Sequence, residues 1–250
     1  MCGYNAVAAI GEFHPEKINR LFLREDRFKD FTKICKQLAA RKRPYKVCED
    51  EELERICKSP HHQGIVAMIE EPILKTLTKE ELDDWSINKE TGLLLSQVGN
   101  DLNLGAIIRS AAFFDCRYII LSTEDKAATV STGTYRVAEG GMEHVEIRTI
   151  SRPPVFLKSA ARKLFVVGAD HRARLHIRDL RDLILVTDKD KKTLSRKSGV
   201  LVVMGNEEQG LPPNIKEQCP CLVRIPGTGK IESLNVAQAA SLFLHEIFEL

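Results

Sequence analysis

Three segments in the second half of the chain combine glycine with amide, hydroxyl, carboxylate and guanidinium side chains. The first, residues 100–114, sets Asn103, Gly105 and Arg109 in an otherwise apolar helical pattern. We expect Asn103 to cap this helix and Arg109 to lie one turn beyond Gly105 on the same face. Because burying an unpaired guanidinium is prohibitive, Arg109 must meet an anion, a carboxylate or a wet cleft. It is therefore either half of a structural ion pair or a functional anion-binding group.

The second and third segments have the same mixture of loop and ligand-binding residues. Residues 204–212 place a glycine on either side of a carboxylate, which predicts either a ligand-facing backbone or a tight surface turn. Residues 225–248 pass from a glycine-rich loop through Ser233 and Asn235 into an apolar helix, and one N-cap does not need both side chains. Each of the three segments follows an apolar strand, so we expect all three at the carboxyl edge of a parallel sheet, where ligands bind.

Common nucleotide and metal motifs do not fit the sequence. The GTGK at 227–230 lacks the earlier glycine of a P-loop, because Arg224 stands there, and Ile231 replaces the hydroxyl residue after the lysine. No GxGxxG follows a predicted strand. Cys219 and Cys221 form a CxC pair without further ligands for a metal. The seven cysteines lack disulfide spacing, so we expect reduced thiols and no metal.

Strands alternating with helices position these segments. In the second half we expect strands at 92–98, 117–121, 143–148, 164–168, 183–187, 199–204 and 221–225, and helices at 105–114, 154–163 and 234–248. This alternation predicts an α/β fold with a mostly parallel sheet covered on both faces.

The first part of the chain has the pattern of a smaller α/β unit. We expect strands at 3–10, 19–23, 44–47 and 64–69, and helices at 14–18, 27–42 and 49–57. A polar helical connector at 75–85 leads to the second unit. These patterns predict a domain over residues 1–72, a linker over 73–91 and a second domain over 92–250.

The composition is that of an ordinary globular chain. Of 250 residues, 43% are hydrophobic and 29% are charged, which excludes disordered and fibrous classes. Apolar stretches stop at about eight residues, short of the ~20 that span a bilayer, and no apolar signal core follows the N-terminus. We therefore expect a cytoplasmic protein.

The distribution of charge is more informative than the net charge of +2. Basic residues gather between Lys33 and Lys46 without an intervening acid, and again between His171 and Arg181. Such clusters suit phosphate contacts, and lysines near a helix C-terminus that complement its dipole fit equally well.

Three sequences together resemble the ordered motifs of a known family. NLGAIIRSA at 103–111, GNEEQGL at 205–211 and IPGTGKIESLNVAQA at 225–239 resemble those of the SpoU (TrmH-like) RNA 2′-O-ribose methyltransferases of the SPOUT superfamily. GYNAVAAI at 3–10 and HQGIVA at 62–67 resemble the opening and closing strands of that family's ribosomal-protein-like substrate-binding domain. The chain begins directly on the opening strand, which is compatible with a trimmed piece of a longer protein.

The resemblance implies a catalytic domain with a C-terminal trefoil knot, a homodimer, S-adenosyl-L-methionine as cofactor, RNA as substrate and no metal. The implied cofactor-binding residues are Gly205, Glu207, Gly210, Leu211, Ile225, Pro226, Ser233, Leu234 and Asn235. The implied catalytic residues are Arg109, Asn103, Ser233 and Asn235. We expect RNA contacts from Arg41, Lys42, Arg43, His62, Gln63 and Arg109.

The chemistry of methyl transfer to a ribose hydroxyl suits these residue types. The reaction is an in-line displacement in which negative charge grows on the oxygen, so the site must orient the reactants and stabilise that charge. Arg109 would stabilise the oxygen and hold the adjacent phosphate, since its very high pKa makes it a poor base. The amides and Ser233 would position the hydroxyl and the loops.

Some features depart from the family pattern. Asn100-Asp101 stands where the family commonly has Asp-Pro, and Ala138-Glu139-Gly140-Gly141 replaces an SxGA segment, which affects substrate identity more than catalysis. The charged residues 188–198 predict a mobile RNA-facing loop or a plain solvated insertion.

The complete motifs favour an enzyme acting on tRNA or rRNA. The alternatives are a non-catalytic RNA-binding relative in ribosome or RNA maturation and a methyltransferase for proteins or small molecules. The basic stretch and the first domain argue against the last of these.

Overall fold

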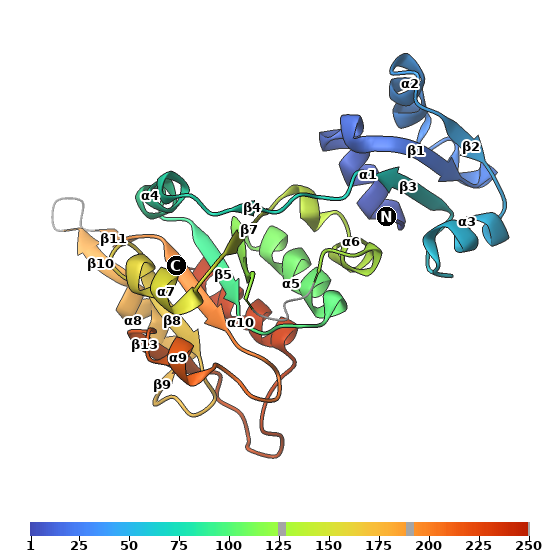
Figure 1. Ribbon diagram of the computed structural model, residues 1–250. Helices are drawn as coiled ribbons and strands as arrows, with labels where there is room; N and C mark the ends of the chain where they lie inside the picture. The colour runs from blue at the N-terminus through green and yellow to red at the C-terminus, as the bar shows by residue number, and fades with distance from the viewer. Residues whose placement is uncertain (125–128, 189–192, 250) are drawn as a thin grey trace.

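In the computed structural model the chain forms two α/β parts, each with its own sheet, joined by an extended segment (Figure 1). The structure describes residues 1–124, 129–188 and 193–249. Within those ranges no helix has both the length and the apolar character needed to cross a membrane. All seven cysteines have free thiols.

The first part is a three-stranded sheet with helices on both faces. Its strands are β1 (Ile18–Leu23), β2 (Tyr45–Val47) and β3 (Ile65–Ile69), and its helices are α1 (Tyr4–Phe13), α2 (Thr32–Ala40) and α3 (Asp50–Cys57). The central strand β1 runs parallel to β2 and antiparallel to β3. Val7 of α1 and Leu38 of α2 pack against Leu21 on one face, whereas Leu53 of α3 packs against Phe22 on the other.

The predicted strand at 3–10 is wrong, because these residues belong to helix α1. The buried residues Ala6, Val7, Ile10 and Gly11 follow a helical spacing, and the alanines favour that conformation. Gly11 lies so close to α2 that a Cβ atom there would come within 2.1 Å of the Ile34 side chain. The predicted helix at 14–18 is a single 3-10 turn, Pro15–Lys17.

The connector adds a strand that the sequence did not predict. β4 (Lys75–Thr76) pairs with the edge of the large sheet, and helix α4 (Lys79–Ile87) follows with a capping box between Thr78 and Glu81. Trp85 of α4 is fully buried and stacks on Tyr118 with ring centroids 4.6 Å apart. The connector is therefore anchored to the second part.

The second part confirms the predicted parallel sheet. Its eight strands have the order β4-β7-β6-β5-β12-β8-β13-β9, and the registers of neighbouring strands are all parallel. The remaining strands are β5 (Thr91–Leu95), β6 (Tyr118–Ser122), β7 (Glu146–Ile150), β8 (Phe165–Ala169), β9 (Leu175–His176), β12 (Val200–Met204) and β13 (Cys221–Arg224).

Helices cover both faces of this sheet. One face carries α5 (Asp101–Phe113), α8 (Leu180–Ile184) and α10 (Val236–Phe248), with α6 (Thr132–Ala138) packed against α5. The other carries α4, α7 (Pro153–Ala160) and α9 (Pro213–Lys216). After β13 the chain returns so that α10 lies beside α5 (Figure 1). This return brings the loop before α10 toward the loops after β5 and β12.

The predicted strand at 183–187 is only partly correct. Helix α8 continues to Ile184, and β10 (Leu185–Asp188) pairs with β11 (Thr193–Arg196) in a separate hairpin. Residues 189–192 of the predicted RNA-facing loop lie outside the described residues. Arg196 donates hydrogen bonds to Thr91 Oγ1 at 2.9 Å and to the carbonyl of Ile247 at 3.1 Å. The hairpin base therefore lies at the amino end of β5, away from the three candidate loops.

Candidate active site

Helix α5 begins one turn earlier than the sequence suggested, and this changes the role of Asn103. Asn100 is the N-cap, because its side-chain oxygen accepts hydrogen bonds from the backbone N–H groups of Leu102 at 2.8 Å and Asn103 at 3.4 Å. The expectation that Asn103 caps the helix is wrong. Its side chain lies inside the first turn and is available to the neighbouring loops.

Asn103 joins the three candidate segments. Its Nδ2 donates to Glu207 Oε1 at 2.5 Å, and its Oδ1 accepts from Asn235 Nδ2 at 3.0 Å. Asn235 caps α10 by accepting from the N–H of Ala237 at 2.9 Å. Ser233 is exposed and has no hydrogen bond to the described part of the chain. Of the two candidate caps, Asn235 takes that role and the Ser233 hydroxyl remains available.

The loop after β12 forms a tight turn whose ends lie close together because they are glycines. Asn206 and Gly210 exchange two backbone hydrogen bonds of 3.1 and 2.9 Å. A Cβ atom on Gly205 would lie 2.3 Å from the carbonyl carbon and oxygen of Gly210, so no side chain fits there. Asn206 Nδ2 also donates to the carbonyl of Gln97 at 3.1 Å, which links this loop to the one after β5.

The loop before α10 exposes backbone polar groups and apolar side chains together. Among the described residues, the only backbone N–H between 226 and 234 with a hydrogen bond is that of Lys230, which donates to Thr228 Oγ1 at 3.5 Å. Ile231 and Leu234 are 82% and 46% exposed. Free amides beside apolar side chains fit a nucleoside with an amino-acid tail, whose ring face is apolar and whose edges form hydrogen bonds.

Arg109 lies apart from this cluster within one chain. It is six residues beyond Asn103, about 9 Å along the helix axis. It is exposed and has no ion pair or hydrogen bond to any described residue, so the structural ion pair considered from the sequence is not observed. It lines a groove of about 430 Å³ between α5 and α1, whose walls include Ala8 and Phe13.

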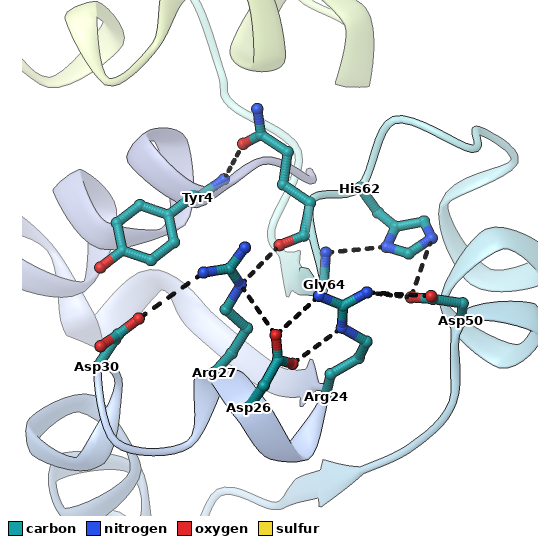
Figure 2. A network of polar contacts seen from close by, with 9 residues as sticks. Tyr4, Arg24, Asp26, Arg27, Asp30, Asp50, His62 and Gly64 are labelled. Carbon is teal, nitrogen blue, oxygen red and sulfur yellow. Dashed lines mark hydrogen bonds and ion pairs between the residues drawn. The ribbon is translucent and has the colours of Figure 1, made fainter.

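Three of the predicted RNA contacts, His62, Gln63 and Arg43, have partners within the first domain, and Figure 2 shows those of His62. Buried His62 accepts from the N–H of Gly64 at 3.1 Å and lies 3.8 Å from Asp50 Oδ1. Gln63 Oε1 accepts from the backbone N–H of Tyr4 at 2.6 Å.

Arg43 also points inward, because its guanidinium donates to the backbone carbonyls of Glu16 and Ile18. Arg41 and Lys42, by contrast, are exposed, and their side chains have no partner among the described residues.

Three ionisable groups have altered pKa values: Asp170, directly after β8, and the two cysteines at and just before the start of β13. Burial alone would raise the pKa of the Asp170 carboxyl, but hydrogen bonds from Lys216 and from the N–H of Arg172 outweigh it, so that pKa lies below its usual value. Burial raises the pKa of the Cys219 thiol to about 12 and also raises the pKa of Cys221. Neither cysteine of the CxC pair is therefore a thiolate near neutral pH.

Sequence reasoning missed several residues that organise the site. Asn206 stands inside the recognised motif at 205–211, and Asn100 lies three residues before the motif at 103–111. Asparagine before a helix or in a tight turn is a readable signal. The contact from the Ser131 hydroxyl to the carboxylate of Asp101, which fixes α6 against the start of α5, had no local signal.

The comparisons with known proteins agree with this geometry. Residues 90–245 match the SpoU rRNA Methylase family, and residues 1–74 match the RNA 2′-O ribose methyltransferase substrate-binding family. The 23S rRNA (guanosine-2′-O-)-methyltransferase RlmB of Acinetobacter baylyi is 30% identical over 98% of this chain and 94% of its own length. The RlmB of Pseudomonas aeruginosa is also 30% identical, with coverage of 98% and 94%.

A solved structure of the SpoU methyltransferase AviRb from Streptomyces viridochromogenes with AdoMet covers all of this chain and 88% of its own, with a TM-score of 0.73 and 21% identity. That likeness shows the fold. The sequence matches confirm the predicted class of enzyme, an RNA 2′-O-ribose methyltransferase that uses S-adenosyl-L-methionine. The chain belongs to the SpoU rRNA methylase family.

Proposed function

We propose that this protein transfers the methyl group of S-adenosyl-L-methionine to a ribose 2′-hydroxyl in ribosomal RNA. The observation that carries the proposal is the hydrogen-bonded chain from Asn235 through Asn103 to Glu207, which joins three distant loops at one edge of the sheet. The names of the RlmB relatives, which align along nearly their whole length, support ribosomal RNA over tRNA.

The loops at 205–211 and 225–235 form the proposed cofactor site. Gly205 and Gly210 keep the first loop narrow, and Glu207 is held by Asn103. Ile225, Pro226 and Leu234 supply apolar surface, and Leu211, which is 8% exposed, packs in the core beside this loop. The free backbone amides of the second loop supply donors. The bound cofactor supplies an electrophilic methyl group on a sulfonium.

The amides of Asn103 and Asn235 hold the reacting hydroxyl in our proposal. Each amide has a fixed orientation, because one N–H of Asn235 points at Asn103 and one N–H of Asn103 points at Glu207. The second N–H of each group and the hydroxyl of Ser233 remain for the ribose. Donors fixed in advance stabilise a developing alkoxide without reorganisation.

Arg109 reaches the reacting centre in a homodimer. It lies on one exposed stripe of α5 with Leu102, Ala106 and Phe113, and Phe113 is 79% exposed. Leu242 of the neighbouring helix α10 is also exposed. Two α5 helices that cross antiparallel about a twofold axis bring the Arg109 turn of one copy opposite the Asn103 turn of the other. The catalytic site is then shared between two copies.

The remaining assignments follow from the family. We place an RNA-binding domain at 1–72, a linker at 73–91 and the catalytic domain at 92–250, supported by family matches over 1–74 and 90–245. The return of α10 beside α5 after the outward passage to β13 supports a C-terminal trefoil knot. We place the protein in the cytoplasm because its proposed substrate is an RNA.

The decisive experiment measures transfer of labelled methyl to purified 23S rRNA and to total tRNA, with cofactor affinity determined in parallel. We expect labelled ribose in rRNA, at a position that loses its methyl group in cells without the protein. Label in tRNA alone would replace the substrate assignment. Tight cofactor binding without label in any RNA would favour a non-catalytic RNA-binding relative.

A further inference from the structure

The outer face of helix α2 carries positive charge without partners. Lys29, Lys33 and Lys36 are exposed, as are Arg41 and Lys42 just beyond the helix. None of these five side chains has an ion pair or hydrogen bond to the described residues. Lys33 and Lys36 are three residues apart on one face of α2, and Lys29 lies in the turn just before the helix.

Other cationic side chains of the same domain already have ion-pair or hydrogen-bond partners. Arg24 pairs with Asp50 at 3.0 Å, and Lys46 pairs with Glu52 at 2.7 Å on the opposite face of the sheet. Arg43 donates to backbone carbonyls. The charge of the α2 face is therefore not neutralised within the domain, although the domain holds nearly as many acids as bases.

The buried side of α2 shows that the lysine face points outward. Phe31, Ile34, Cys35 and Leu38 are buried against the sheet. At 100° per residue the helical positions Ile34, Cys35 and Leu38 lie opposite Lys33 and Lys36. The lysine face therefore points away from the domain core.

Two exposed aromatic rings adjoin this face. Phe28 precedes Lys29 and is 36% exposed, and Tyr45 of β2 is 40% exposed. Their ring centroids are 6.2 Å apart. Tyr45 pairs in register with Leu21, whose side chain belongs to the core cluster under α2, so Tyr45 lies on the α2 side of the sheet. The aromatic pair and the lysines thus share one side of the domain.

We propose that Phe28, Tyr45 and the five exposed cationic residues in and beside α2 form a binding surface for a single-stranded segment of the RNA substrate. Lysines contact phosphates, and an unpaired base stacks on the exposed rings. A duplex hides its base faces within the stack, so this surface favours single strands. The inference rests on the proposed function and specifies which face of the first domain holds the RNA.

Lys42 allows a selective test, because its backbone conformation is one that glycine adopts more easily than lysine does. Its φ is 55°, in the left-handed region where glycine is normally found after a helix. Lys58 at the end of α3 has a φ of 53° and lies on the other side of the sheet. Lys42→Gly and Lys58→Gly therefore remove the same charge from the same backbone conformation, and only the first changes the α2 side.

The experiment measures binding of the full chain to single-stranded oligouridine and to an RNA duplex of equal length over a range of salt concentrations. Lys29→Gln, Lys33→Gln and Lys36→Gln combined should lower the slope of log K against log salt by about 2, because each phosphate contact contributes about 0.7. Tyr45→Leu should weaken oligouridine binding roughly tenfold through lost stacking and leave duplex binding unchanged.

The paired glycine variants test the location of the surface. Lys42→Gly should weaken oligouridine binding without lowering the thermal unfolding midpoint, whereas Lys58→Gly should leave binding unchanged. Equal losses from both variants, or duplex bound as tightly as oligouridine, would overturn the inference.

Methyl transfer to 23S rRNA separates this inference from the proposed function. If the wild-type protein methylates 23S rRNA but its α2 variants bind oligouridine with unchanged affinity, the proposed binding surface is refuted and the proposed function stands. If the α2 variants lose oligouridine affinity but the wild-type protein methylates no RNA, the proposed function is refuted and the binding surface is supported.

Discussion

The side-chain amide of Asn235 donates a hydrogen bond to Oδ1 of Asn103 across 3.0 Å, although 132 residues separate them in the chain. The other end of the Asn103 amide donates to Glu207. A single side chain in the first turn of α5 therefore fixes the positions of two loops.

Asn103→Asp should abolish most methyl transfer. The substitution removes the donor to Glu207 and puts a second carboxylate beside it, so the loops separate. We expect the transfer rate to fall at least about 100-fold, as for loss of a fixed catalytic donor. Single-turnover assays with labelled methyl donor measure this. Asn100→Asp is the matched control, because aspartate caps a helix as well as asparagine does. An equal loss in both variants would locate the effect in the helix cap.

Gly205→Ala should abolish cofactor binding. The new Cβ would lie 2.3 Å from backbone atoms of Gly210, so the loop after β12 must open. Lys58→Gly in the first domain is the control, since its backbone φ of 53° suits glycine and it lies outside the proposed cofactor site. Calorimetric titration with the cofactor should show no binding for Gly205→Ala and normal affinity for Lys58→Gly. Normal affinity of Gly205→Ala would place the cofactor elsewhere.

Mixed dimers should reveal a shared catalytic site. Asn103→Ala and Arg109→Ala are each expected to be inactive, and Arg109→Ala should keep nearly normal cofactor affinity. When equal amounts are unfolded and refolded together, half of the dimers contain one of each chain, and one of their two sites is intact. Activity should therefore recover to about a quarter of the wild-type value. No recovery, with mixed dimers demonstrated, would mean that both residues act within one chain.

Asp170→Asn should lower stability near neutral pH but not in acid. The carboxyl is 8% exposed, and its pKa lies below the usual value because Lys216 and the N–H of Arg172 donate to it. A lowered pKa in the folded state stabilises the fold above the unfolded pKa of about 4, and this stabilisation is lost as the pH falls through the folded pKa. We expect a loss of about 1 to 2 kcal/mol at neutral pH.

Denaturant titrations of wild type and Asp170→Asn at several pH values measure this difference. The gap between the two should narrow below about pH 4. Asp26→Asn offers a control, because the Asp26 carboxylate pairs with Arg24 but is 55% exposed, and its effect should be small. A gap for Asp170→Asn that stays constant with pH would attribute the loss to packing.

The sequence predicted those features that depend on local patterns. Apolar runs such as 199–204 predicted buried parallel strands, and β12 occupies the middle of the sheet. The order of the motifs was sufficient to identify the family. The strand predicted at residues 3–10 was wrong, because a short apolar run fits a strand and a buried helix equally well. Packing against α2 decides between the two.

Only the tertiary structure decided which side chains meet. Arg43 and Gln63 have the residue types of RNA contacts, yet their partners are backbone groups of their own domain. Arg109 belongs to the same motif as Asn103, yet the helix carries it about two turns away, onto an exposed apolar stripe. Hydrogen-bond partners are set by the positions of distant backbone segments, and local periodicity carries no information about those positions. The residue types were therefore determined by the sequence, and their partners by the fold.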